Sequence, residues 1–169
     1  MNLPISPSAS SWPTTGLATP IIIWSVSLPL PPADALPLPE HKATGSGAQD
    51  LVGYRIDLSD PAGGAVVRLT VEAKHLNRNG TLQGGIHAML LDAAAGFAAS
   101  RHLAGQGDIV PVVTLSLNAQ YLAPAALGEV IATGQVMGGG YKIVHAEAEI
   151  RSADGTVLSR GSGVFKRAG

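Results

Sequence analysis

A single apolar stretch constrains most strongly what this chain can fold into. From about Gly84 to Leu103, small and apolar residues lie on almost every side of the helix that the stretch predicts. Gly105 and Gly107 follow it, and glycine is favoured just beyond the end of a helix. A helix with so little polar surface is stable only when it is buried. We therefore expect one central helix, with the other elements of the domain packed around it.

From residue 50 onward, the stretches on either side of this helix alternate between apolar and polar residues, as strands with one buried face do. Glycine-containing turns at residues 60–64, 138–140 and 153–155 separate these stretches and indicate hairpins. We expect strands at about residues 52–58, 66–73, 112–122, 129–137, 141–151 and 156–166. These strands and one long helix predict an α+β domain, in which a six-stranded antiparallel sheet wraps around the helix.

The alternation also predicts which side chains share a face. The stretch 112–122 predicts an apolar face of Val113, Leu115, Leu117, Ala119 and Tyr121, opposite a polar face of Thr114, Ser116, Asn118 and Gln120. A meander of strands leaves sheet edges free, and such edges are commonly covered by another subunit. We therefore expect a dimer or a larger assembly.

Residues 1–49 differ from the remainder and predict an extended or disordered extension, which leaves residues 50–169 as the folded domain. The first forty residues contain nine of the chain's twelve prolines and no Lys or Arg. A secretory signal or a transit peptide needs basic residues, so neither fits. The apolar run 21–30 is far shorter than the roughly 20 residues of a membrane span. A start assigned too far upstream is the alternative interpretation.

The overall charge argues against two classes of partner. The formal net charge is −1 and the sequence pI is about 6.5, whereas nucleic acids and anionic membrane surfaces usually attract a basic patch. The chain has no cysteine, which excludes a disulfide framework, a thiolate nucleophile and a cysteine zinc site, and which fits the cytoplasm. His75, His102 and His145 form no metal-ligand spacing with nearby carboxylates, so we expect no metal.

The predicted helix contains one carboxylate, Asp92, among small apolar residues. An ionised group is costly to bury unless something pairs with it or uses it. The helix begins at Gly84 and Gly85, whose N–H groups have no partner within the helix and carry partial positive charge. Without side chains, these glycines allow a carbonyl oxygen to approach closely, as in an oxyanion hole. A base or nucleophile and an electrophile activator are two groups that attack on a carbonyl carbon requires.

The spacing of these groups predicts two subunits. Gly84 and Asp92 are eight residues apart, which is roughly 12 Å along a helix at about 1.5 Å per residue. One helix cannot present both groups to the same carbonyl carbon. Two antiparallel helices from two subunits can, so we expect an obligate homodimer with two equivalent sites at its interface.

Residues 51–166 resemble the hotdog-fold acyl-CoA thioesterases of the phenylacetate-degradation and hydroxybenzoyl-CoA types. The resemblance rests on Asn77-x-x-Gly80-Thr81-Leu82-Gln83-Gly84-Gly85, on Asp92, on Asn118-x-Gln120-Tyr121-Leu122-x-Pro124-Ala125 and on Gly128-Glu129. The family usually reads Asn-x-x-Gly-Thr-x-His-Gly-Gly, with an acidic residue eight positions past the first glycine of the final pair. The resemblance implies a hotdog fold, an acyl-CoA substrate and a homodimer or homotetramer.

The resemblance also implies roles for individual residues. Asp92 corresponds to the catalytic carboxylate, Gly84 to the backbone N–H that polarises the thioester carbonyl, and Asn77 to a polar residue that positions water or substrate. Thr114 falls where relatives carry a Ser or Thr near the carboxylate. Gln83 departs from the family's usual His, so it can hydrogen bond but cannot transfer a proton near neutral pH.

Each candidate also has a structural interpretation. Asp92 could be a satisfied structural carboxylate, Asn77 and Asn79 turn formers, and Thr114 part of a polar strand face. We include Gly85, Asn79 and His87 as substrate-binding candidates, although His87 could equally be structural. Candidates for contact with an aromatic acyl group or the adenine are Tyr54, Phe97, Tyr121, Tyr141 and Phe165.

The sequence therefore predicts a hydrolase of acyl-CoA thioesters that uses no metal or separate cofactor, since coenzyme A is part of the substrate. Two alternatives stay open. One is a non-catalytic acyl-CoA-binding hotdog protein. The other is an enoyl-CoA hydratase or dehydratase, which would need a catalytic His in a motif that we do not find.

Overall fold

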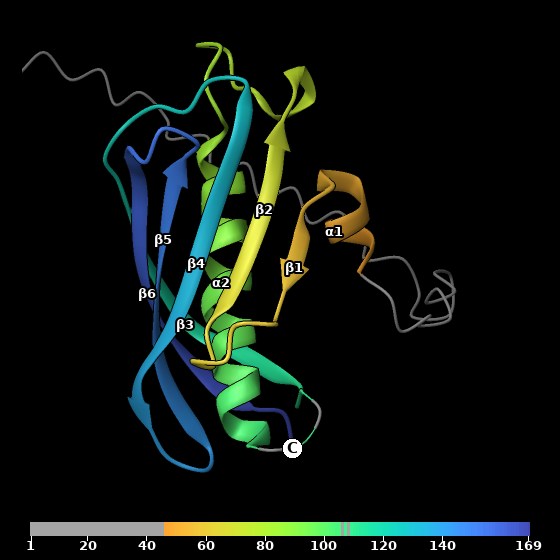
Figure 1. Cartoon of the computed structure of the whole chain (residues 1–169), viewed down its shortest axis with the longest axis vertical. Helices are drawn as coiled ribbons and strands as arrows, with labels where there is room; N and C mark the ends of the chain where they lie inside the picture. The colour runs from red at the N-terminus through yellow and green to blue at the C-terminus, as the bar shows by residue number, and fades with distance from the viewer. Residues whose placement is uncertain (1–45, 106, 108) are drawn as a thin grey trace, which may run out of the picture. The chain divides into compact units, whose positions relative to one another are not determined.

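The computed structural model describes residues 46–105, 107 and 109–169. Nearly all of the predicted proline-rich extension lies outside the described residues. The elements follow in the order α1 (Gly47–Val52), β1 (Arg55–Asp57), β2 (Ala65–Val71), the 3-10 helix η1 (Ala73–His75), α2 (Gly84–Ala104), β3 (Val112–Tyr121), β4 (Gly128–Gly139), β5 (Ile143–Ser152) and β6 (Val157–Arg167). The predicted architecture of six strands around one long helix is confirmed (Figure 1).

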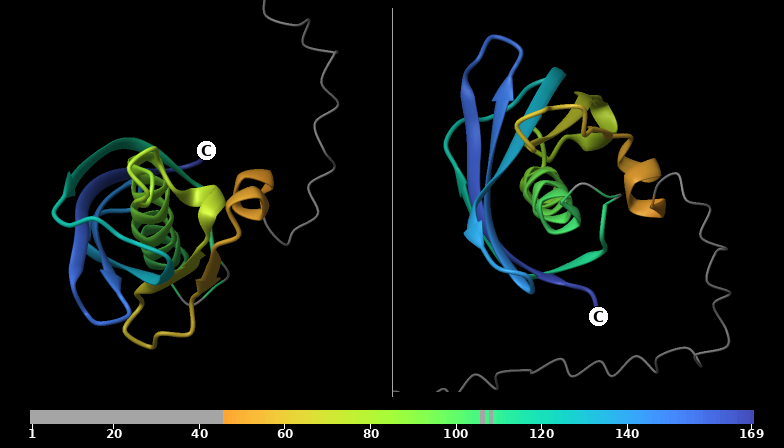
Figure 2. Two further views of the ribbon diagram at one scale, coloured as in Figure 1. Left: turned by 90° about the horizontal axis from the view of Figure 1, so that it is seen from above. Right: turned by 60° about the horizontal axis from the view of Figure 1, so that its bottom comes forward.

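All six strands form one antiparallel sheet with the order β1-β2-β4-β5-β6-β3. The sheet curves around α2, which lies along its inner face (Figure 2). The edges of the sheet are the short strand β1 and the ten-residue strand β3. The chain thus places its long helix inside the curve and leaves a long strand at one edge.

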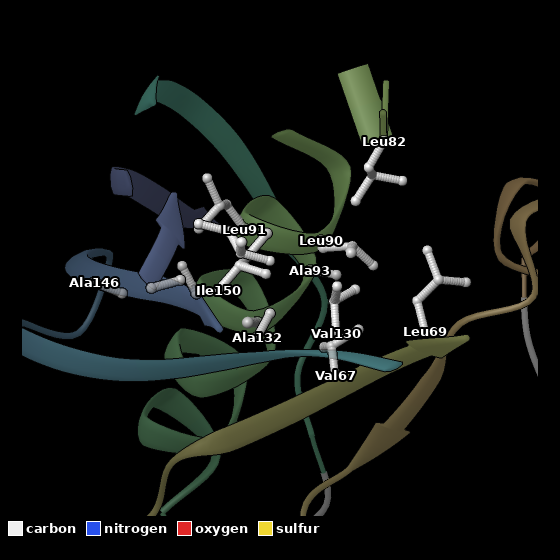
Figure 3. Packing of buried hydrophobic residues seen from close by; sticks show 14 of the residues in the cluster. Val67, Leu69, Leu82, Leu90, Leu91, Ala93, Val130, Ala132, Ala146 and Ile150 are labelled. Atoms are coloured by element: carbon white, nitrogen blue, oxygen red, sulfur yellow. The ribbon is translucent and has the colours of Figure 1, made fainter. Parts of the chain in front are cut away.

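The core forms where the small residues of α2 meet the inner face of the sheet. Figure 3 shows side chains of Leu90 and Leu91 from α2 among residues of β2, β4 and β5, with Ile150 fully buried. The contact is close at Gly134 of β4, where an added Cβ would overlap the carbonyl of Ala94. Alanine and glycine at such positions let helix and sheet backbones approach, which explains why this helix is rich in small residues.

The beginning of the domain differs from the prediction. The alternation predicts a strand over residues 52–58, whereas α1 ends at Val52 and β1 covers only Arg55–Asp57. Ser46 caps α1 by accepting a hydrogen bond from the Gln49 N–H, and Gly53 ends the helix with φ of 85°. The alternating pattern begins at Val52, which these caps hold in the helix, so the strand starts later than predicted. Ala73, predicted as strand, lies in η1.

β3 departs from the predicted alternation because it contains an irregularity. Its pairing with β6 places Thr114 opposite Phe165 and Ser116 opposite Val164, so Leu115 is an extra residue in β3. Thr114 consequently points to α2, as do Ala119 and Tyr121 further along the strand. The prediction that Thr114 lies on the face opposite Ala119 and Tyr121 is therefore wrong.

Within the described residues, no helix is both long enough and apolar enough to cross a membrane.

Candidate active site

Asp92 lies at the middle of α2 beside the edge strand β3. Its Oδ1 accepts a hydrogen bond of 2.8 Å from the Thr114 hydroxyl. The side chain is half-buried, in contrast to the buried residues Leu91 and Ala93 that flank it in the sequence. The β3 irregularity turns Thr114 inward and so supplies this partner. The carboxylate is therefore oriented by a hydroxyl while part of it stays accessible.

A cavity of about 390 Å³ opens next to this carboxylate. Residues of α2, the start of β3 and the segment 109–111 form most of its wall, together with Tyr54. Most of the lining is apolar, and it includes Met89, Phe97 and Val112. An apolar cavity with one oriented carboxylate at its wall fits an acyl group whose thioester lies near Asp92.

Tyr54 is a member of this site that sequence reasoning named only as a possible aromatic contact. Its ring lines the same cavity as Asp92. Burial, and then the negative charge of Asp92, raise the pKa of the Tyr54 hydroxyl above its usual value, so this group stays protonated at neutral pH. Tyr54 lies just before β1, far from Asp92 in the sequence. The two residues meet at the cavity only through tertiary packing, so no local sequence pattern indicates that they are neighbours.

Phe97 also lines the cavity, whereas Phe165 is completely buried in the core, and Tyr141 contacts the guanidinium of Arg167.

The other end of α2 carries the glycines. Gln83 is the N-cap residue, and its side chain is exposed and makes no capping hydrogen bond. Neither the Gly84 nor the Gly85 N–H has an acceptor among the residues that the structure describes. The Tyr121 hydroxyl donates to the Gly84 carbonyl over 3.3 Å, so it does not occupy the N–H. Two backbone donors at the positive end of a helix are thus free to bind a carbonyl or carboxylate oxygen.

The turn that leads into this helix end is closed by Asn77. Its Oδ1 accepts hydrogen bonds from the Asn79 and Thr81 N–H groups, and its Nδ2 donates to the Thr81 hydroxyl. Gly80 has φ of 73°, a conformation that favours glycine. In this structure Asn77 therefore shapes the turn before Gly84, and Asn79 takes part through its backbone.

His87 lies one turn further along α2 and faces the interior. Only 3% of its surface is exposed, and its Nδ1 is 3.0 Å from the Ser159 hydroxyl of β6. The Tyr121 ring meets it edge-on, with 5.8 Å between ring centroids. Burial lowers the pKa of the imidazole below its usual value. His87 does not line the cavity beside Asp92.

The predicted site residues thus form two groups within one chain. Asp92 and Thr114 meet at the cavity, whereas Gln83, Gly84 and Gly85 gather at the start of the helix. Both groups lie along β3, because Thr114 contacts Asp92 and Tyr121 contacts Gly84. Among the described residues, no group of three or more His, Asp or Glu could hold a metal ion.

Comparison with known proteins identifies the family. The Thioesterase superfamily profile matches residues 79–159. Acyl-coenzyme A thioesterase 13 of Homo sapiens is 31% identical over 110 residues, which span 63% of this chain and 76% of that protein. The homologous enzyme of Mus musculus is 28% identical over 98 residues, spanning 57% of this chain and 67% of the relative.

Solved structures agree with this match. A conserved protein of Pseudomonas aeruginosa is 33% identical, with a TM-score of 0.65 over 73% of this chain and 95% of that protein. The PaaI protein from the phenylacetic acid degradation operon of E. coli is 27% identical, with a TM-score of 0.65 over 74% of this chain and 86% of that protein. The chain therefore belongs to the hotdog-fold acyl-CoA thioesterases of the Thioesterase superfamily and is an enzyme that hydrolyses thioesters.

Proposed function

We propose that this enzyme hydrolyses an acyl-CoA thioester to the free acid and coenzyme A, with Asp92 as the base or nucleophile. One observation carries this assignment: the Asp92 carboxylate, oriented by Thr114, lies at the wall of an apolar cavity. Such a cavity can hold the acyl group while the carboxylate reaches the thioester carbon. The reaction needs no metal or separate cofactor, because the carboxylate and backbone N–H groups supply the chemistry.

As a base, Asp92 would take a proton from water, whose oxygen forms a bond to the carbonyl carbon. The negative charge that develops on the carbonyl oxygen needs donors, and the Gly84 N–H is the candidate. Breakage of the carbon–sulfur bond then releases coenzyme A as a thiolate. The thiolate takes the proton that Asp92 received from water, which returns Asp92 to its starting form. As a nucleophile, Asp92 would itself bond to the carbonyl carbon while the carbon–sulfur bond breaks and coenzyme A leaves as a thiolate. Water would then hydrolyse the resulting anhydride to the free acid and restore Asp92.

The donor must come from a second subunit, because Gly84 and Asp92 lie at different positions along the single helix α2. The edge strand β3 offers the surface for that subunit. Among the described strands it pairs with β6 alone, and it exposes Val113 and Leu115, which are 47% and 55% accessible. A long apolar edge strand is a ready site for pairing with another chain.

The positions of the two groups along β3 explain how a symmetric pair would complete the site. Thr114 marks the Asp92 end and Tyr121 marks the Gly84 end. Antiparallel pairing of β3 with its copy, about an axis at Asn118 and with Leu115 as the extra residue, brings Thr114 opposite the partner's Tyr121. Asp92 then lies beside the Gly84 end of the partner's helix, and the same holds at the second site.

The first test is hydrolysis itself. Purified protein is assayed for thiol release against aliphatic and aromatic acyl-CoA esters, with the Asp92→Asn variant beside it. We expect turnover of at least one ester by the unaltered protein and loss of turnover in a variant that stays folded by circular dichroism. Tight binding of acyl-CoA without turnover would instead support the non-catalytic alternative.

The second test isolates the backbone donor. Gly84→Pro removes the N–H at the first helical position, where proline is tolerated, and the extended backbone of Gln83 suits a following proline. Gly84→Ala keeps the N–H, and its Cβ would lie at an ordinary 3.6 Å from the Tyr121 ring. We expect Gly84→Pro to lower kcat about 10²–10³-fold and Gly84→Ala to have a much smaller effect.

The third test asks whether the site crosses subunits. Co-expression of Asp92→Asn with Gly84→Pro yields mixed dimers in which one site has both groups intact and the other has neither. Random pairing should restore about a quarter of the unaltered turnover. A mixture of Asp92→Asn with Asp92→Ala has no intact site and is the control. Failure of the first mixture to exceed its control would show that one subunit supplies both groups.

A further inference from the structure

The cavity beside Asp92 has few side-chain donors that could bind a negatively charged ligand. Of its hydroxyl groups, that of Thr114 donates to Asp92 and that of Ser100 donates to the Val110 carbonyl. Both are therefore already engaged. The Tyr54 hydroxyl is the remaining side-chain donor in the described lining, and its raised pKa keeps it neutral.

The described side chains that line the cavity also include an acidic group without a basic one. No Lys, Arg or His is among the described residues that line it, and Asp92 is the ionised member of that lining. The salt bridges of Arg151 and Arg160 with Glu149 lie elsewhere, on β5 and β6. An acyl group with a second carboxylate would therefore place that anion in an apolar space without a cation, near an existing negative charge. Burying an unpaired charge is costly, and a like charge adds to the cost.

From this lining we propose that the enzyme selects acyl groups that end in an uncharged group and rejects those that end in a carboxylate. This inference rests on the proposed acyl-CoA hydrolysis and adds a rule of specificity to it. The selecting feature is the wall formed by Phe97, Ile109 and Val112. It excludes a terminal carboxylate because it provides neither a counterion nor a free pair of donors.

The experiment compares hexanoyl-CoA with adipoyl-CoA, whose acyl chains have equal length and differ in the terminal carboxylate. We expect kcat/KM for adipoyl-CoA to be roughly 100-fold lower, since each tenfold corresponds to about 1.4 kcal/mol and an unpaired buried charge costs more than one such step. Octanoyl-CoA and suberoyl-CoA give the same comparison at a greater length. Values within threefold for both pairs would overturn the inference while leaving the hydrolase intact.

A charge variant tests whether this cavity is responsible. Ile109 lines the cavity yet is 47% exposed, so Ile109→Lys places a cation at the wall with little disturbance of the core. We expect it to lower the hexanoyl-to-adipoyl ratio at least about tenfold, as an opposite charge at short range would. Leu51→Lys is the matched control, because Leu51 is 79% exposed on α1 and lies outside the cavity lining.

An unchanged ratio in Ile109→Lys, with the fold intact, would show that selection occurs elsewhere and would overturn the assignment to this cavity. If Ile109→Lys does not fold, the comparison of the two substrate pairs on the unaltered enzyme decides the rule. Hydrolysis of neither member of either pair, together with an inactive aromatic panel, would overturn the proposed function and the inference with it.

Discussion

Asp92 and His87 are polar residues five positions apart on the same apolar helix, yet their surroundings differ. Asp92 lies beside the edge strand β3, accepts a hydrogen bond from Thr114 and borders a cavity. His87 is 3% exposed, and its polar contact is with Ser159 of β6. Because both interrupt an apolar pattern, the sequence makes both candidates. The difference teaches that a polar residue of this helix stays accessible where it lies beside the edge of the sheet, and is sealed in where the sheet covers it.

The largest expected effect comes from Asp92. Asp92→Asn keeps the shape of the side chain and removes its ability to act as a base or nucleophile. We expect kcat to fall about 10²–10⁴-fold, the usual contribution of acid–base catalysis. The free energy of unfolding, measured in urea, should change little because the side chain is half-buried at the cavity. Near-normal turnover would remove Asp92 from the mechanism.

His87 should show the opposite balance. His87→Leu leaves the buried Ser159 hydroxyl without its partner, and we expect a loss of about 1–3 kcal/mol in the free energy of unfolding. The double variant with Ser159→Ala removes both partners and should recover much of that loss. We expect kcat and KM near those of the unaltered enzyme. A raised KM without a loss of stability would support the substrate-binding role that the sequence suggested.

Thr114 tests how much the oriented carboxylate depends on its partner. Thr114→Val keeps the shape and removes the hydroxyl that donates to Asp92. We expect kcat to fall about tenfold, which corresponds to one hydrogen bond to a charged group. Thr114→Ser retains a hydroxyl and is the control. Equal activity of the Val and Ser variants would mean that the hydrogen bond does not contribute to turnover.

The smallest expected effect is the response of stability to pH. Since burial lowers the pKa of folded His87 below its usual 6.5, the unfolded chain binds the proton first as the pH falls. The stability that neutral His87 contributes is complete above pH 6.5 and is lost as the pH falls through the folded pKa, by at most about 1.4 kcal/mol per pH unit. The double variant of His87 and Ser159 should show a flatter profile in urea titrations.

Two carboxylates change stability only in more acidic solution, which keeps the His87 window separate. Hydrogen bonds from Ser59 hold the pKa of Asp57 below its usual 3.8, and those from Ser152 and Thr156 do the same for Asp154. Their contributions are present above that pH and are lost below it. A profile with the same slope above pH 4 in the double variant would contradict the assignment to His87.

Much of the fold could be predicted because periodicity reports burial directly. The helix predicted from Gly84 to Leu103 extends to Ala104, and the four strands after it begin and end close to the expected residues. The apolar helix must lie inside the fold, and each alternating strand must turn its apolar face toward that helix. The start of the domain was predicted incorrectly because the caps of α1 are local hydrogen bonds that an alternating pattern does not reveal.

The site could be predicted less completely. Asp92 and Gly84 were found because an ionised group in an apolar helix and a glycine pair at a helix start are unusual. Their presence on one helix is confirmed, whereas their roles stay predictions. The cavity lining could not be predicted, because Tyr54 and Ile109 reach α2 only through tertiary packing. The inward turn of Thr114 follows from a single extra residue that alternation alone cannot locate.

That extra residue makes the length of β3 part of the chemistry. Inserting one further residue after Ser116 would leave a strand that could still pair with β6, yet every residue before the insertion would shift by one pairing position and exchange its face. Thr114 would then turn away from Asp92 while the sheet persisted. In an evolving family, insertions and deletions within this strand should accordingly be rarer than substitutions of its exposed side chains. Selection would act there on the number of residues as strongly as on their identity.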